Sequence, residues 1–301
     1  MLHIIPDSSV IFRVGGLHVE VSSRSHPLLP ETNPEYLPFL CTEQGIAGEG
    51  LLVDLRVGEI SAVPTGRLLL EAGDSWVLRK REQHLVITPH PGPQGDPLAW
   101  EADIDQGRRY VRILCDPTLL VERDGVRRIS SPFHYPLDQV VLMLALAGEG
   151  AIAHAAGVVL RGKGVILAGP SRAGKTTLSR LCASGGITVL SDDRVIIRRV
   201  GEEMRMFGTP WPGEGRFAEN RSVPLAAIVF LTKGEENRLE PLPRASAVRR
   251  LLPVLSLPWF DQELANRSLD FCTELTARVS SHELIFRPDP GAVEAIEGAC
   301  R

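Results

Sequence analysis

Short apolar or alternating stretches, separated by turn residues, fill the first part of this 301-residue chain. Alternation of apolar and polar positions is typical of strands that bury one face. We therefore expect a mostly β N-terminal part, folded as antiparallel meanders. Its expected strands are 9–14, 18–21, 51–57, 67–71, 76–80, 84–88 and 110–115.

Longer apolar segments with helical spacing replace this alternation after residue 130. Val140–Ala147 predicts a buried helix, and the leucine spacing predicts two more helices at 245–256 and 260–279. Asp289 followed by Pro290 predicts the start of a terminal helix, because Asp caps helices and Pro is favoured in their first turn. Further strands are expected at 187–190, 195–200, 204–207, 226–231 and 282–287.

These two patterns divide the chain into two predicted domains. Residues 1–130 form the β-rich domain, and residues 131–301 form a domain of α+β or α/β class. The length allows this division because domains commonly have about 150 residues. A hydrophobic content of 44% is sufficient for two cores.

A tight hairpin is predicted over 157–169, because two apolar runs flank Gly162-Lys163. Its second strand leads into Gly169–Thr176, which has the pattern Gly-x-x-x-x-Gly-Lys-Thr and precedes a predicted helix at 174–184. The glycines let backbone N–H groups turn toward an anion, and the helix N-terminus adds positive potential.

Lys175 adds a side-chain cation, and the Thr176 hydroxyl can bind Mg²⁺. The alternative is a glycine-rich turn before an ordinary helix, but the order strand, loop, helix favours a nucleoside triphosphate site. The expected nucleotide-binding residues are Gly169, Pro170, Ser171, Arg172, Ala173, Gly174, Lys175, Thr176 and Thr177.

Asp192 and Asp193 follow the next predicted strand, one helix after the glycine-rich loop. Adjacent carboxylates repel each other, so a nearby cation favours their ionised forms. One can hold Mg²⁺, and the other can accept a proton from an attacking hydroxyl. The alternative is an acidic turn before the strand that begins at Val195.

His154, the hairpin, the loop and Ser191-Asp192-Asp193-Arg194 together resemble the catalytic half of bacterial HPr kinase/phosphorylase. That fold is shared with the ATP-dependent phosphoenolpyruvate carboxykinases. A later basic signature of the bifunctional enzymes is absent, so efficient phosphorolysis is not expected. The chain looks more like diverged relatives, among them the peptide-tailoring kinases encoded beside lasso-peptide genes.

The resemblance implies ATP and Mg²⁺ as cofactors and assigns the site residues. Asp192 is expected to act as the general base, with Lys175 and His154 near the phosphates. Thr176, Asp193 and Glu214 are expected to hold Mg²⁺. In the Gly- and Pro-rich loop around Glu214, Arg216 can neutralise phosphoryl charge or be a surface arginine, and Trp211 can stack on substrate or fill the core.

Charge and composition exclude several other functions. A formal charge of −4 argues against nucleic acid and anionic membranes as partners, and the five scattered cysteines indicate reduced thiols instead of a zinc site. No apolar run is long enough to span a bilayer, and Met1–Pro6 lacks the start of a signal peptide. We therefore expect a cytoplasmic protein, for which a homo-oligomer is compatible with the sequence.

The function expected from the sequence is ATP-dependent transfer of the γ-phosphoryl group to a serine-type hydroxyl of a peptide or small protein. A small-metabolite kinase is one alternative. Another is a regulatory protein that binds ATP and hydrolyses it slowly or not at all. The preference for ATP over GTP rests on the resemblance alone, because glycine-rich loops of this kind accept either purine.

Overall fold

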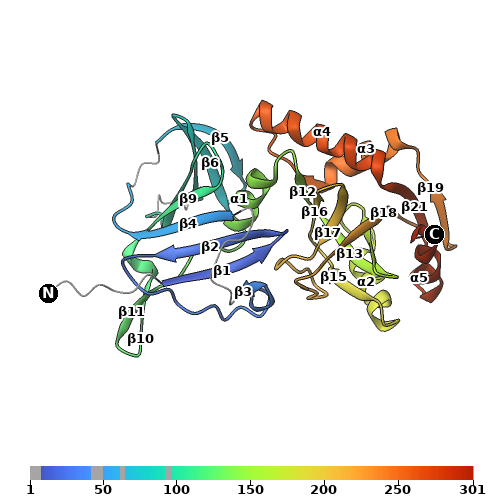
Figure 1. The fold of residues 1–301 in the computed structure, drawn as a ribbon, viewed down its shortest axis with the longest axis horizontal. Coiled ribbons are helices and arrows are strands. Elements are labelled where there is room, and N and C mark those ends of the chain that lie inside the picture. Colours follow the sequence, from blue (N-terminus) through green and yellow to red (C-terminus); the bar gives the residue numbers. More distant parts are fainter. Residues whose placement is uncertain (1–7, 42–49, 62–64, 92–96, 301) are drawn as a thin grey trace. The chain divides into compact units, whose positions relative to one another are not determined.

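The computed structural model describes residues 8–41, 50–61, 65–91 and 97–300 of a mixed α/β chain (Figure 1). The chain forms two compact units. The first contains the described residues of Met1–Arg13, Leu17–Thr32 and Leu40–Ala145, and the second contains those of Val14–Gly16, Asn33–Phe39 and Leu146–Arg301. Two short segments from the N-terminal part therefore belong to the second unit.

The first unit is built on a large sheet. Its strands lie in the order β3 (Leu40–Cys41), β1 (Ser8–Val14), β2 (Leu17–Ser23), β4 (Gly50–Val57), β9 (Tyr110–Cys115), β8 (Trp100–Ile104), β7 (His84–Pro89), β6 (Trp76–Arg81) and β5 (Arg67–Ala72). Beside it are the hairpin β10 (Leu120–Arg123) and β11 (Val126–Ile129), and helix α1 (Leu137–Leu146), which the sequence placed at the start of the second domain.

The expected antiparallel meander is confirmed from β5 to β9, leaving out β4. It is wrong for β4, which pairs in parallel with both β2 and β9. Parallel neighbours need long connections, and the chain between β2 and β4 and between β4 and β9 is long enough to provide them.

The second unit has a sheet in the order β15 (Thr188–Ser191), β13 (Ala155–Leu160), β14 (Lys163–Ala168), β18 (Ser222–Lys233), β17 (Glu203–Phe207), β16 (Val195–Val200), β12 (Gly150–Ala153) and β20 (Leu255–Ser256). β21 (Ser280–Phe286) pairs with β18 and with β19 (Arg238–Pro241). The predicted hairpin is confirmed, since β13 and β14 pair antiparallel. β14 also pairs in parallel with β18, which places it inside the sheet.

Helices cover both faces of this sheet (Figure 1). α2 (Lys175–Ser184) and α5 (Pro290–Glu297) pack on the face that buries Val165 and Leu167. α3 (Arg244–Leu251) and α4 (Gln262–Arg278) pack on the face that buries Ile166. Successive strand residues point to opposite faces, so the continuous apolar run of β14 reflects burial on both sides.

The helix boundaries follow from local chemistry. Asp289 caps α5 as predicted, and its carboxylate accepts the Gly291 N–H at 2.9 Å. The predicted helix at 245–256 is too long, because α3 ends at Leu251 and Pro253 lies in the short 3₁₀ turn that follows. Proline lacks the N–H that a continuing α-helix requires and clashes with the preceding turn.

In the described part of the chain, no helix is long and apolar enough to cross a membrane. The stretch Met1–Pro6, used above for the expectation about a signal peptide, lies outside the described residues.

Candidate functional site

The glycine-rich loop lies between β14 and α2, as the sequence predicted. Gly174 caps α2 with φ of 108°, a left-handed conformation that favours glycine. A Cβ at this position would also lie 2.6 Å from Cζ of the Phe286 ring. Both the backbone and the close aromatic contact therefore require glycine here.

Lys175, the first residue of α2, folds back over this loop. Its side chain is only 8% exposed, and Nζ donates to the carbonyl oxygens of Gly169 at 2.9 Å and Pro170 at 3.3 Å. Burial lowers the pKa of Lys175 from 10.5, the Asp193 carboxylate opposes this shift, and Arg194 adds to it. The ammonium group thus lies at the loop beside a carboxylate.

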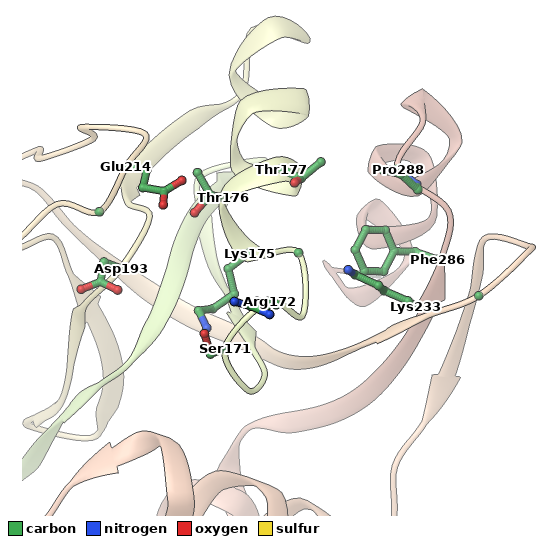
Figure 2. Close-up of a pocket in the computed structure, with 13 residues that line it drawn as sticks. Ser171, Arg172, Lys175, Thr176, Thr177, Asp193, Glu214, Lys233, Phe286 and Pro288 are labelled. Atoms are coloured by element: carbon green, nitrogen blue, oxygen red, sulfur yellow. The ribbon is translucent and has the colours of Figure 1, made fainter.

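A cavity of about 900 Å³ opens in front of the loop. Figure 2 shows Asp193 and Glu214 on one side of the loop residues and Lys233, Phe286 and Pro288 on the other. The lining residues are Ser171, Arg172, Gly174, Lys175, Thr176, Thr177, Asp193, Gly213, Glu214, Lys233, Gly234, Phe286 and Pro288.

This lining brings together eight of the site residues predicted from the sequence. Six belong to the glycine-rich loop and the start of α2, and the other two are Asp193 and Glu214. Gly169, Pro170, Ala173, Asp192 and His154 are not among the lining residues. The sequence missed the wall formed by Lys233, Gly234, Phe286 and Pro288. Lys233 and Phe286 are the last residues of β18 and β21, and Gly234 and Pro288 lie in the segments that follow these strands. The one available signal was that the ends of neighbouring parallel strands share an edge of the sheet.

Asp193 has a cationic or polar partner at each oxygen. Oδ1 lies 3.2 Å from Nδ1 of His154, and Oδ2 accepts a hydrogen bond from the Arg194 guanidinium. Burial lowers the pKa of His154 below 6.5, the Asp193 charge opposes the shift, and Lys175 and Arg194 add to it. The environment of His154 therefore favours its neutral form, next to a carboxylate that lines the cavity.

Asp192 has a different environment, although it is the adjacent residue. It is 1% exposed, and its carboxylate accepts the backbone N–H groups of Gly213 at 2.9 Å, Gly215 at 2.6 Å and Phe217 at 3.4 Å. These bonds hold the loop from which Glu214 reaches the cavity. Asp192 thus binds the loop backbone and is not among the cavity-lining residues, whereas Asp193 lines the cavity.

The remaining residues of this loop lie outside the cavity lining. Arg216 forms an ion pair with Glu35, which belongs to one of the N-terminal segments of the second unit. Asn220 donates to the carbonyl oxygen of Pro38 at 3.1 Å in the same segment. Trp211 is 4% exposed, so it is part of the packed interior.

Within the described ranges, no three side chains of His, Cys, Asp or Glu are grouped to hold a metal ion by themselves. Thr176, Asp193 and Glu214 do line the same cavity. A hydroxyl and two carboxylates suit Mg²⁺, which commonly takes one or two carboxylates and completes its shell with water and substrate phosphates. The donors present therefore fit Mg²⁺.

Comparisons with known proteins identify a family model and solved structures to which this chain is similar. The family described as SynChlorMet cassette protein ScmC matches residues 135–269, a range that contains the loop, both aspartates and Glu214. The solved HPr(Ser) kinase/phosphatase from Coxiella burnetii is similar with 14% identity and a TM-score of 0.30, over 49% of this chain and 87% of that chain. No curated protein matches.

Proposed function

We propose that the second unit binds ATP with Mg²⁺ in this cavity and transfers the γ-phosphoryl group to a hydroxyl of a peptide or small protein. The observation that carries the proposal is one cavity lined by the glycine-rich loop, Lys175, Thr176 and two carboxylates. Phosphoryl transfer needs these parts: amides and a cation for the phosphates, oxygen ligands for a metal, and a base for the nucleophile.

The different residues on the two sides of the cavity suggest how the nucleotide is oriented. The phosphates belong at the loop, and the transferred group belongs on the side of Asp193 and Glu214 (Figure 2). The nucleoside then lies toward Phe286 and Pro288, whose apolar surfaces suit a purine. Nothing in this wall selects adenine over guanine, so the choice of ATP rests on the resemblance described above.

Thr176 and Glu214 are the Mg²⁺ ligands in this proposal. When bound, the ion neutralises charge on the β- and γ-phosphate oxygens. The sequence analysis assigned Asp193 to the metal and Asp192 to the proton, but the Asp192 carboxylate accepts backbone N–H groups of the Glu214 loop and is not among the cavity-lining residues. We therefore assign the general base to Asp193 and leave Asp192 to hold the Glu214 loop.

The chemical step then uses residues of this chain in defined roles. The acceptor hydroxyl loses its proton to the Asp193 carboxylate as its oxygen bonds to the γ-phosphorus. The bond between that phosphorus and the β–γ bridging oxygen breaks, and ADP leaves with the electron pair. Lys175 neutralises charge on the phosphates, and the neutral His154 keeps Asp193 oriented.

Binding of MgATP, measured by calorimetry, tests the nucleotide part of the proposal. Lys175→Ala should weaken the affinity by about 10- to 100-fold, the usual range for lost charge-assisted hydrogen bonds. Lys163→Ala is the matched control, because Lys163 is an exposed lysine at the start of β14. Equal affinity of folded Lys175→Ala and wild-type protein would contradict the assignment of the loop.

The acceptor class rests on the resemblance to peptide-tailoring kinases. The matching family is described as a cassette protein, which makes small peptides encoded in the same gene group the first acceptors to test. Transfer to a free metabolite, or phosphate release with no transfer, would support the alternative functions. A cytoplasmic location, where ATP and Mg²⁺ are abundant, is part of the same proposal.

A further inference from the structure

Arg172 has an unfavourable backbone conformation in the middle of the glycine-rich loop. Its φ is 66°, in the left-handed region, and its side chain is exposed. A non-glycine residue in this region costs roughly 1 kcal/mol or more, a cost that glycine avoids. Strained residues of this kind cluster at active sites and ligand clamps. The question is what the arginine side chain does there.

The cavity supplies one answer, because Arg172 is among its lining residues. The charged side chains of the lining are three cations, Arg172, Lys175 and Lys233, and two anions, Asp193 and Glu214. The ammonium of Lys175 is already bonded to carbonyl oxygens of its own loop. Among the described residues, no side chain is recorded in a hydrogen bond or ion pair with Arg172.

The sequence analysis had considered Arg216 for a role in neutralising phosphoryl charge. Arg216 is instead paired with Glu35 and is not a lining residue. The arginine that lines the cavity is Arg172, from the glycine-rich loop. The planar guanidinium offers parallel N–H donors that match two oxygens of a phosphate, which a lysine cannot do.

We propose that Arg172 binds the phosphate chain of the nucleotide as a second side-chain cation beside Lys175. The inference rests on the proposed function, since it takes a polyphosphate as the ligand. A glycine at this position would relax the loop but remove the guanidinium. The ligand contact thus offsets a local cost in the fold.

Arg172→Gly separates binding from stability, because it removes the guanidinium and relieves the strain together. We expect the Kd for MgATP and for MgADP to rise by about 10- to 100-fold, with a midpoint of thermal unfolding equal to or above that of the wild type. Arg172→Lys keeps a positive charge but lacks the parallel N–H donors of the guanidinium, so its Kd should be intermediate.

Arg161→Gly is the matched control. Arg161 also has a positive φ, of 51°, but lies in the turn between β13 and β14 and is not a lining residue. Its guanidinium also pairs with Glu297 at 3.2 Å, but this ion pair is exposed and contributes at most about 1 kcal/mol, so the variant should be about as stable as the wild type and bind nucleotide equally well. All variants are measured by calorimetry with MgATP, MgADP and adenosine, and adenosine affinity should not change.

The outcomes discriminate between the two levels of the proposal. A wild-type Kd for Arg172→Gly overturns the role of Arg172 and leaves the nucleotide site standing. Unchanged nucleotide affinity with a raised KM for the acceptor also overturns it, because Arg172 would then contact the acceptor. Absence of MgATP binding by the wild-type protein overturns the proposed function and this role with it.

Discussion

The carboxylate of Asp192 accepts the backbone N–H of Gly215 at 2.6 Å, from a position that is almost completely buried. A Cβ on Gly215 would lie 2.7 Å from Oδ2 of Asp192, and one on Gly213 would lie 2.9 Å from the same atom. Only glycines allow the loop to approach this closely. Glu214 lies between them and faces the cavity (Figure 2).

Asp192→Asn should therefore act on the loop more than on the chemistry. An amide replaces one acceptor oxygen by an NH₂ group that meets backbone N–H donors, which costs about 1–3 kcal/mol of unfolding free energy. The displaced Glu214 should raise the Mg²⁺ concentration needed for half-maximal activity. Denaturant titration and Mg²⁺ titration of the same variant measure both effects.

Asp193→Asn is expected to behave in the opposite way. The unfolding free energy should change little, because the Asp193 side chain is partly exposed and its partners can reach water. Phosphoryl transfer should fall by about 10²- to 10⁴-fold, as is usual for loss of a general base. If Asp192→Asn loses transfer at full stability and Asp193→Asn does not, the two roles are exchanged.

Glu35 and Arg216 should position the same loop from its other side. Reversing either charge, in Glu35→Arg or Arg216→Glu, is expected to raise the half-saturating Mg²⁺ concentration by about two- to fivefold, since an exposed ion pair contributes at most about 1 kcal/mol. The double variant restores an opposite-charge pair and should return toward the wild-type value. Equal effects in single and double variants would show that the pair does not position Glu214.

Local chemistry explains what the sequence predicted correctly. The hairpin β13–β14, the loop and α2 were all predicted, because apolar runs, turn residues and glycine spacing lie within one short stretch. β8 was missed although its sequence carries a signal. Trp100, Ala102 and Ile104 alternate with Glu101 and Asp103, the pattern of a strand with one apolar face.

Contacts between distant parts of the chain could not be predicted from the sequence. Asp192 and Asp193 are adjacent and chemically identical, and their contacts with distant residues distinguish them: residues 213–217 return to Asp192, and His154 lies against Asp193. The wall formed by Phe286 and Pro288 carries no motif, because an apolar residue at the end of a strand and a proline just after it have no characteristic spacing. The place of Glu35 in the second unit also depends on tertiary packing alone.

The unfolding free energy is expected to depend on pH through His134 in the first unit. Its Nε2 lies 2.6 Å from the Glu31 carboxylate, and its Nδ1 lies 3.1 Å from the Ser131 carbonyl oxygen. Burial lowers the pKa of His134, but the hydrogen bond and charge of Glu31 outweigh it, so the pKa is raised above 6.5. The charged form, which donates from both nitrogens, is the one that folding favours.

Because the pKa of His134 is higher in the folded state, its ion pair with Glu31 contributes to the unfolding free energy. This contribution is fully present below pH 6.5, the unfolded-state pKa, and is lost as the pH rises through the folded-state pKa. His134→Gln should therefore lower the unfolding free energy more at pH about 5.5 than at pH about 9, in parallel urea titrations. Glu31→Gln should likewise lower the unfolding free energy more at the lower pH than at the higher pH. A His134→Gln effect that is independent of pH would contradict the charged pair.

Transfer of label from γ-³²P-ATP tests the central claim most directly. The wild-type protein is incubated with Mg²⁺, labelled ATP and peptides encoded in its gene neighbourhood, with Lys175→Ala and Asp193→Asn in parallel. We expect label on a peptide hydroxyl with the wild type, and a loss of about 10²-fold or more with Asp193→Asn. Label found only in free phosphate or in a small metabolite, or equal labelling of the peptide by Asp193→Asn, would contradict a peptide kinase that uses this carboxylate.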